Sequence, residues 1–250
     1  MRALIILSVA AAVFSTTVSY ADEIRVGGGG AAIAAIFAPI KSSYTRSSGD
    51  QLSIIQSSPS KGLASLIRGE VDIATGAHPI ENIVSGAIKE GVSVDPASLT
   101  VHAAGRSRTM VVLHRSNPVP RLSRNEIKGI FTGKIVNWKE LGGTPGEIIV
   151  VWGRITPGQN ALFIKEMLDG EPVLADVLEA GDYRSILETV ANTPGSIGID
   201  PFAIADSSVH LPEIPLITSP LLVITRGKPA PRVQRLINYI TGEGSRLIRQ

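Results

Sequence analysis

Cysteine is absent from this 250-residue sequence, and net charge is nearly absent as well. Without cysteine the chain forms no disulfide and has no thiol to which a lipid could be attached. The formal net charge is only +2 at pH 7. The clusters Arg106–Arg108 and Arg121–Arg124 are short, and we interpret them as solvated loop charges rather than as a binding patch. Nothing in the charge distribution therefore favours nucleic acid as a partner.

Motifs typical of enzymes are also missing. The histidines lack the spacing of a metal site, and no Gly-x-Ser-x-Gly nucleophile elbow occurs. The run Gly27–Ala32 fits a dinucleotide-binding fingerprint by letter only, and Pro39 so early in the following helix argues against that function. The run Gly129–Ile135 lacks the spacing of a phosphate-binding P-loop. We therefore expect no catalysis, no cofactor and no metal.

The first 21 residues have the pattern of an export signal. Arg2 precedes an apolar run from Ala3 to Phe14, and small residues follow as far as Ala21. A membrane anchor is the alternative, but this run is shorter than the roughly 20 residues that a spanning helix needs. The pattern predicts cleavage after Ala21 and an exported, soluble chain.

Strands and helices alternate along the rest of the chain. The order strand, loop, helix, strand is seen in Gln51–Ala74, and a strand, a loop and a helix follow one another again in Glu147–Leu168. Such alternation is typical of βαβ units and predicts a largely parallel sheet with helices on its faces. No solenoid repeat or low-complexity linker is present. The chain is long enough for one large domain or two small ones.

Two segments predict an anion site. In Arg25–Ile40, a strand leads through four glycines into a helix, and in Glu147–Leu168 the polar loop Gly153–Asn160 leads into another. A helix start offers unpaired N–H groups and the positive end of the helix dipole, which suit an anion. Because the two segments lie far apart in the chain, we expect two lobes that face one ligand.

Several motifs resemble those of the phosphate-binding proteins of bacterial phosphate ABC transporters and of related periplasmic solute-binding proteins. The resemblance covers nearly the whole chain after the leader. It is carried by the glycine-rich opening Gly27–Tyr44, by Gly69–Ala74 with Pro79-Ile80, by Glu126–Ile135 with Trp138, and by Thr193–Gly198.

The resemblance implies an α/β, type II periplasmic binding protein fold with the ligand cleft between two lobes joined by two crossover strands. Val111–Leu113 would carry the chain into the second lobe and Leu221–Ile224 would return it. The expected organisation is a signal peptide over 1–21, the first part of lobe 1 over 22–110, lobe 2 over 111–220 and the return segment of lobe 1 over 221–250.

The same resemblance implies the ligand-binding positions, and several of them depart from the family pattern. Alanines stand where the family has Thr-Phe, Ala77 stands where it has a ligand-accepting aspartate, and most hydroxyls after the arginine are lost. Without that aspartate, we see no group that would favour a protonated oxyanion over a fully ionised one. The expected ligand-binding residues are Gly30, Ala31, Ala32, Ser58, Ser60, Ala77, Arg154, Gly158, Gln159 and Asn160.

Each polar candidate also has a structural interpretation. Arg154 could be an ordinary loop arginine, Ser58 and Ser60 could stabilise a turn, and Gln159 and Asn160 could cap the following helix. We expect His78 to lie near the site without touching the ligand. Asp72 is expected to stabilise its own loop.

These observations predict a periplasmic binding protein that captures a small anion, phosphate or another oxyanion, and delivers it to the membrane permease of an ABC transporter. The alternative is a sensor that presents the same ligand to a membrane histidine kinase. Both functions need the same cleft, so the sequence does not separate them. A secreted hydrolase would need a nucleophile and a base, and we find neither.

Overall fold

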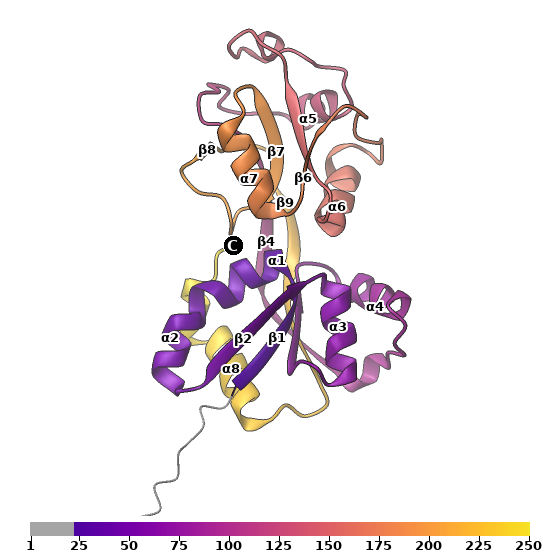
Figure 1. Ribbon diagram of the computed structural model, residues 1–250, viewed down its shortest axis with the longest axis vertical. Helices are drawn as coiled ribbons and strands as arrows, with labels where there is room; N and C mark the ends of the chain where they lie inside the picture. The colour runs from indigo at the N-terminus through magenta and orange to yellow at the C-terminus, as the bar shows by residue number, and fades with distance from the viewer. Residues whose placement is uncertain (1–22) are drawn as a thin grey trace, which may run out of the picture.

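The computed structural model describes residues 23–250 as two α/β lobes, one above the other (Figure 1). The expected signal peptide over 1–21 lies outside the described residues. Indigo and purple elements from the start of the chain form the lower lobe together with the yellow C-terminal helix. The upper lobe is built from the middle of the chain. Two long strands run between the lobes, as the predicted crossover strands require.

One mixed sheet extends through both lobes in the order β2-β1-β3-β9-β4-β7-β5-β6, with β8 paired to β4. The pairs β1/β2, β1/β3, β5/β7 and β5/β6 are parallel, as predicted. The crossover strands pair antiparallel with each other and with β3 and β7, so the prediction of a largely parallel sheet is wrong there. The strands are β1 (Glu23–Gly29), β2 (Gln51–Ser57), β3 (Ile73–Gly76), β4 (Leu99–His114), β5 (Ile149–Gly153), β6 (Leu178–Ala180), β7 (Ser196–Pro201), β8 (Val209–His210) and β9 (Ile217–Arg226).

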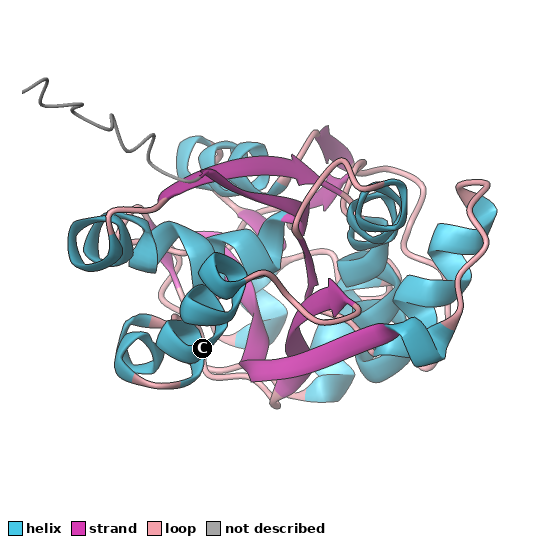
Figure 2. Ribbon diagram, turned by 90° about the horizontal axis from the view of Figure 1, so that it is seen from below, coloured by secondary structure: helices cyan, strands magenta, loops and turns pink. Residues whose placement is uncertain are grey.

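Helices cover the faces of the sheet (Figure 2). Within residues 23–250, none of them is long and apolar enough to cross a membrane. The α-helices are α1 (Gly30–Ala32), α2 (Ala38–Ser48), α3 (Pro59–Arg68), α4 (Ile80–Lys89), α5 (Arg124–Phe131), α6 (Pro157–Met167), α7 (Tyr183–Asn192) and α8 (Pro231–Thr241). The π-turn η1 (Ile33–Phe37) joins α1 to α2, and the short 3₁₀ turns are η2 (Pro96–Ser98), η3 (Trp138–Leu141) and η4 (Glu243–Leu247).

Two helices begin earlier than the sequence pattern predicts. In the sequence, apolar residues at helical spacing follow Gly62 and Ala161, whereas the helices start at Pro59 and Pro157. Proline is favoured in the first turn of a helix because its missing N–H would have no partner there. The expected polar loops are therefore shorter, and Ser60, Gly158, Gln159 and Asn160 lie in first helical turns.

Most of the four-glycine run belongs to strand β1 rather than to a loop. A side chain on Gly28, whose φ is +149°, would collide with the carbonyl oxygen of Thr75 on the neighbouring strand. A Cβ on Gly62 of α3 would lie 2.6 Å from the Cα of Gly28. Close packing of β1 on β3 and of α3 on β1 therefore requires these glycines, and only Gly29, as the N-cap, and Gly30 lie at the helix start.

Pro39 is accommodated by a wider turn inside one continuous helix from Gly30 to Ser48. Proline has no N–H, so it cannot donate to the carbonyl four residues earlier, which is that of Ala35. The turn at Ile33–Phe37 widens to π geometry, and the Ala35 oxygen instead accepts a hydrogen bond of 3.0 Å from the Arg249 backbone N–H. The backbone of Arg249 thus helps to hold the helix Gly30–Ser48, whose start faces the upper lobe.

Each lobe has its own apolar core. In the lower lobe, Phe37, Ile40 and Tyr44 pack with residues of α8, and in the upper lobe Phe131 and Phe163 lie at the centre. Tyr183 of α7 packs against both the lower core and an upper one. The lobe boundaries expected at 110 and 220 fall inside the crossover strands β4 and β9.

Asp200 on β7 is fully buried, and neither of its carboxylate oxygens has a hydrogen-bond partner among residues 23–250. Burial and, to a smaller extent, the nearby charge of Asp182 raise its pKa, Arg184 partly offsets them, and the resulting pKa is about 9. The carboxyl group is therefore protonated in the folded protein at neutral pH.

The buried carboxyl group makes stability fall with rising pH. The unfolded group ionises near pH 3.8 and the folded group near pH 9, so between these values the folded state holds a proton that the unfolded state has lost. Asp200→Asn should flatten this dependence and raise the melting temperature at pH 7 by at least ~2 °C. Thermal unfolding between pH 4 and 9 measures both. The exposed control Asp176→Asn should change neither, and an unchanged pH slope in Asp200→Asn would contradict the assignment.

Candidate functional site

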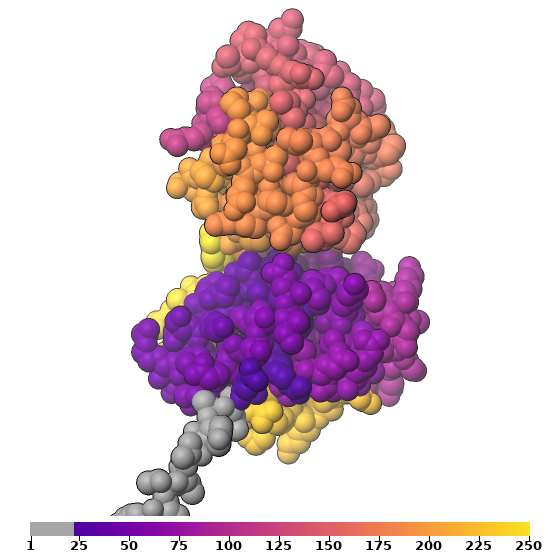
Figure 3. Space-filling model, in the orientation of Figure 1, coloured from indigo at the N-terminus to yellow at the C-terminus, as the bar shows by residue number. Residues whose placement is uncertain are grey.

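A cavity of about 1130 Å³ lies between the lobes and is lined by both. The lower lobe contributes the end of β1, the starts of α1 and α3 and one face of α4, and the upper lobe contributes the loop before α6, one face of α6 and the loop before α7. The crossover strands form its floor. In the space-filling view the molecule narrows where the lobes meet (Figure 3). The cleft that the sequence predicts is therefore present.

The lower lobe presents backbone and hydroxyl groups to the cleft. Gly30 and Ala31 lie at the start of the long helix formed by α1, η1 and α2. Ser58 is the N-cap of α3, and its Oγ accepts a hydrogen bond of 3.1 Å from the Lys61 backbone N–H. Its hydroxyl proton is still available to a ligand. Ser58 thus has the structural role that the sequence left open, and it also lines the cleft.

The upper lobe presents Arg154 to the cleft from a fixed backbone. The Arg154 and Ile155 backbone N–H groups donate to the carbonyls of Ala180 and Gly181, at 2.8 and 3.0 Å. Within residues 23–250, the exposed guanidinium group forms no ion pair and donates no hydrogen bond that would satisfy it. A guanidinium held on a rigid loop can bind an oxyanion with two parallel hydrogen bonds.

Eight of the ten expected ligand-binding residues line the cleft, and Ala32 and Asn160 do not. Ala32 is fully buried in the core of the lower lobe. The Asn160 side chain donates to the Gly153 carbonyl at 2.8 Å and so holds the loop before α6. Gln159 is at the cleft, but it is only 5% exposed and donates to the Ile199 carbonyl at 3.1 Å. The residues that line it are Gly30, Ala31, Ser58, Ser60, Ala77, Arg154, Gly158 and Gln159.

The sequence pattern did not reveal the floor of the cleft. Ser107 and Thr109 are two residues apart on β4, and Ser219 pairs with Ser107 from β9. Alternation along an extended strand places such hydroxyls on one face, but the apolar run that marks this strand in the sequence begins only at Thr109. Other residues missed at the cleft are Gln56, Lys61, Asn82, Lys89, Lys165, Asp182 and Tyr183.

Two contacts bring the lobes together across the cleft. The imidazole of His78, from the lower lobe, lies against Gly158 in the first turn of α6, so a Cβ there would collide with Nε2. A Cβ on Gly30 would lie 3.3 Å from the ring of Tyr183 in the upper lobe. Burial lowers the pKa of His78, so the ring is neutral at pH 7. His78 lines the cleft, which agrees with its expected place near the site, and its lack of contact with the ligand stays a prediction.

Asp72 stabilises its loop, as the sequence predicts. Its carboxylate accepts hydrogen bonds from the Arg25 backbone N–H at 2.8 Å and from Arg25 Nε at 3.2 Å. Burial acts to raise its pKa, but the hydrogen bonds from Arg25 and the charge of Arg232 outweigh burial and lower it. Asp72 does not line the cleft.

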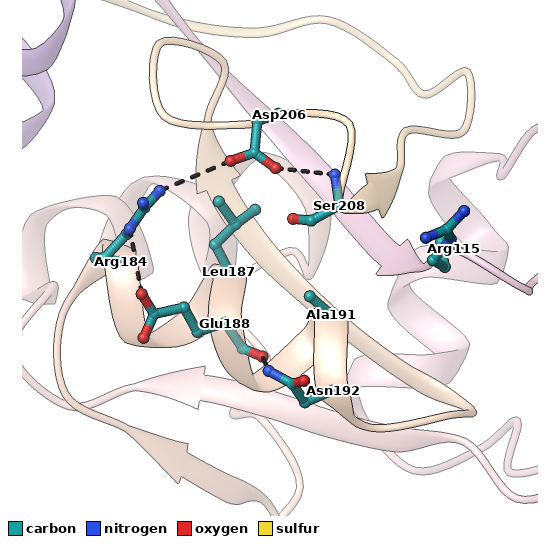
Figure 4. A pocket seen from close by; sticks show the side chains of 8 residues that line it. All are labelled: Arg115, Arg184, Leu187, Glu188, Ala191, Asn192, Asp206 and Ser208. Atoms are coloured by element: carbon teal, nitrogen blue, oxygen red, sulfur yellow. Dashed lines mark hydrogen bonds and ion pairs between the residues drawn. The ribbon is translucent and has the colours of Figure 1, made fainter.

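A second hollow, of about 380 Å³, lies on the upper lobe beside α7 (Figure 4). Its charged groups largely satisfy one another: Arg184 pairs with Glu188 at 3.2 Å and with Asp206 at 3.7 Å. Asp206 also accepts the Ser208 backbone N–H at 2.9 Å. The cleft between the lobes is the stronger candidate because it is about three times larger and is lined by residues of both lobes.

Comparison with known proteins agrees with this fold. A phosphate-binding protein PstS from Bacillus subtilis is 36% identical over 132 residues, which cover 52% of this chain and 43% of that protein. The matched part is thus less than half of the relative's length. A phosphate ABC transporter substrate-binding protein from Clostridium perfringens, crystallised with bound phosphate, superposes with a TM-score of 0.75 and 21% identity over 90% of this chain and 96% of that chain.

A phosphate transport receptor from Vibrio cholerae superposes with a TM-score of 0.62 and 18% identity, over 89% of this chain and 95% of that one. At these identities the two structures support the two-lobed fold alone. The family model for the PBP superfamily domain matches residues 15–204, which is most of the chain. The protein therefore belongs to the PBP superfamily and has the two-lobed fold of its periplasmic binding proteins.

Proposed function

We propose that this protein is an exported solute-binding protein that captures an oxyanion of the phosphate class and delivers it to the permease of an ABC transporter. The observation that carries the proposal is Arg154, whose unpaired guanidinium enters a cleft that two helix starts also face. The relatives reported above are described as phosphate-binding and phosphate-transport proteins. They support a transport role and give no support to presentation of the ligand to a histidine kinase.

The cleft offers donors from three directions to an anion. The lower lobe supplies backbone N–H groups near Gly30 and Ala31, and the upper lobe supplies Arg154 with the first turn of α6. Helix starts stabilise negative charge through their free N–H groups and dipole. The hydroxyls of the floor, on Ser107, Thr109 and Ser219, compensate for those that the α6 loop has lost. Binding in this cleft needs no catalytic residue.

We expect this site to select among oxyanions differently from a site that contains a carboxylate. A carboxylate accepts a hydrogen bond from a protonated oxyanion and repels a fully ionised one. The position of the family's aspartate is Ala77, which is buried and apolar here. His78 beside it is neutral, so it can donate or accept through different tautomers. We therefore propose an oxyanion site that does not discriminate strongly by protonation state.

Arg154→Ala should weaken binding of inorganic phosphate by roughly 10- to 150-fold, because a charge-assisted hydrogen bond contributes about 1.5–3 kcal/mol. The fold should be unchanged, since this side chain supports no other described residue. Titration calorimetry gives the affinity and circular dichroism gives the fold. Arg115→Ala, in the second hollow, is the matched control and should bind as the unmodified protein does. Equal affinities for the Arg154 and Arg115 variants would refute the assignment of the site.

Gly158→Ala should hold the lobes apart, because the added methyl group occupies the place of the His78 ring. Small-angle scattering should show a larger radius of gyration for the variant, and removing the ring in Gly158→Ala/His78→Ala should reverse the change. Gly146→Ala, where a Cβ meets little, is the control. A radius that stays constant across all these proteins would show that the contact does not set the separation of the lobes.

A further inference from the structure

The cleft extends well beyond the anion-binding end, along two facing helices. On α4 it is lined by Asn82, Gly86 and Lys89, and on α6 by Gly158, Ala161 and Lys165. The first and last residues of each set are seven positions apart, which corresponds to about 10 Å along a helix at 1.5 Å per residue. The cavity is therefore a groove about two helical turns long.

The volume of this groove is large for a free oxyanion. Pockets of roughly 300–1,000 Å³ bind whole organic molecules, and this one measures about 1130 Å³. The lobes already touch, through His78 on Gly158 and through Gly30 beside Tyr183. The space therefore remains with the lobes in contact, and an inorganic oxyanion would leave most of it to water.

The far part of the groove has apolar walls and a charged end that carries two lysines and the carboxylate of Glu90. Ile83 and Leu162 line it from opposite helices, and Lys89 and Lys165 lie at its end. Within residues 23–250, Lys89 forms no ion pair, and the ammonium group of Lys165 approaches only Glu166, at 3.6 Å. Ammonium groups donate hydrogen bonds to hydroxyl or anionic groups of a ligand. This end suits a polar organic body rather than a purely apolar one.

We propose that the ligand is an organic phosphate monoester, an inference that rests on the proposed function of the cleft. The phosphate group lies at Gly30, Ala31 and Arg154. The hydroxylated organic body extends between α4 and α6 toward Lys89 and Lys165. Affinity then comes from both ends of the groove, and inorganic phosphate uses only one.

Titration calorimetry at one ionic strength with inorganic phosphate, glycerol 3-phosphate and glucose 6-phosphate tests this proposal. Glucose 6-phosphate should bind at least tenfold more tightly than inorganic phosphate, with glycerol 3-phosphate between them. Inorganic phosphate binding as tightly as the esters would overturn the inference and leave the oxyanion-binding function intact. Failure of all three to bind would overturn the proposed function itself.

The substitution Ala161→Trp tests the part of the groove proposed for the organic body separately from the anion-binding end. Ala161 is exposed on the second turn of α6, so an indole there fills the space for the organic body and leaves the helix start open. The variant should bind glucose 6-phosphate at least tenfold more weakly and inorganic phosphate within about twofold of the unmodified protein. Ala161→Ser is the control and should change neither affinity. Equal loss for both ligands, or no loss for the ester, would contradict the placement of the organic body.

Discussion

The antiparallel pairing of β4 with β9 is the constraint on which the rest of the structure depends. The pairing runs from Leu99 opposite Arg226 to Thr109 opposite Ile217, with one irregularity between Ala103 and Gly105. It continues the sheet from one lobe into the other, so the two halves of the cleft are fixed to a common floor. Because the chain crosses between the lobes here, neither half of the proposed anion site could be positioned without this pair.

On either side of the β4/β9 pair, each lobe has the same local arrangement of a strand followed by a helix. A parallel strand ends at the cleft and a helix begins there, as β1 leads into α1 and β5 leads into α6. In open α/β sheets, ligands bind beyond the carboxyl ends of the strands for this reason. The two helix starts come from opposite lobes, and Arg154 supplies the full positive charge that backbone groups lack. The arrangement explains how a chain with almost no net charge can hold an anion.

The local signals that the sequence predicts well are those set by a few neighbouring residues. Ser123 and Glu126 have the Ser-x-x-Glu spacing that is typical of a capping box, and the structure forms both of its hydrogen bonds. The alternation of strands and helices and the position of Arg154 at the cleft are confirmed as well. Each of these features depends on hydrogen bonds or on side-chain periodicity among residues that are close together in the sequence.

The features that the sequence did not reveal depend on residues far apart in the chain. The hydroxyls of Ser107 and Ser219 share the floor only because β4 pairs with β9 in one register. Asn160 was expected at the ligand, but its amide is used by the Gly153 carbonyl once the helix begins at Pro157. His78 reaches the cleft because Gly158 of the other lobe leaves room for its ring. Side-chain type alone does not determine any of these pairings.

The central claim is that one anion is bound by both lobes at once. Backbone ¹⁵N NMR during a titration with inorganic phosphate tests it most directly, since amide shifts report which N–H groups meet the ligand. The resonances of Gly30 and Ala31 in the lower lobe and of Gly158 and Gln159 in the upper lobe should move together with a single dissociation constant. Shifts confined to one lobe, or centred on Arg115 and Arg184 in the second hollow, would contradict the claim.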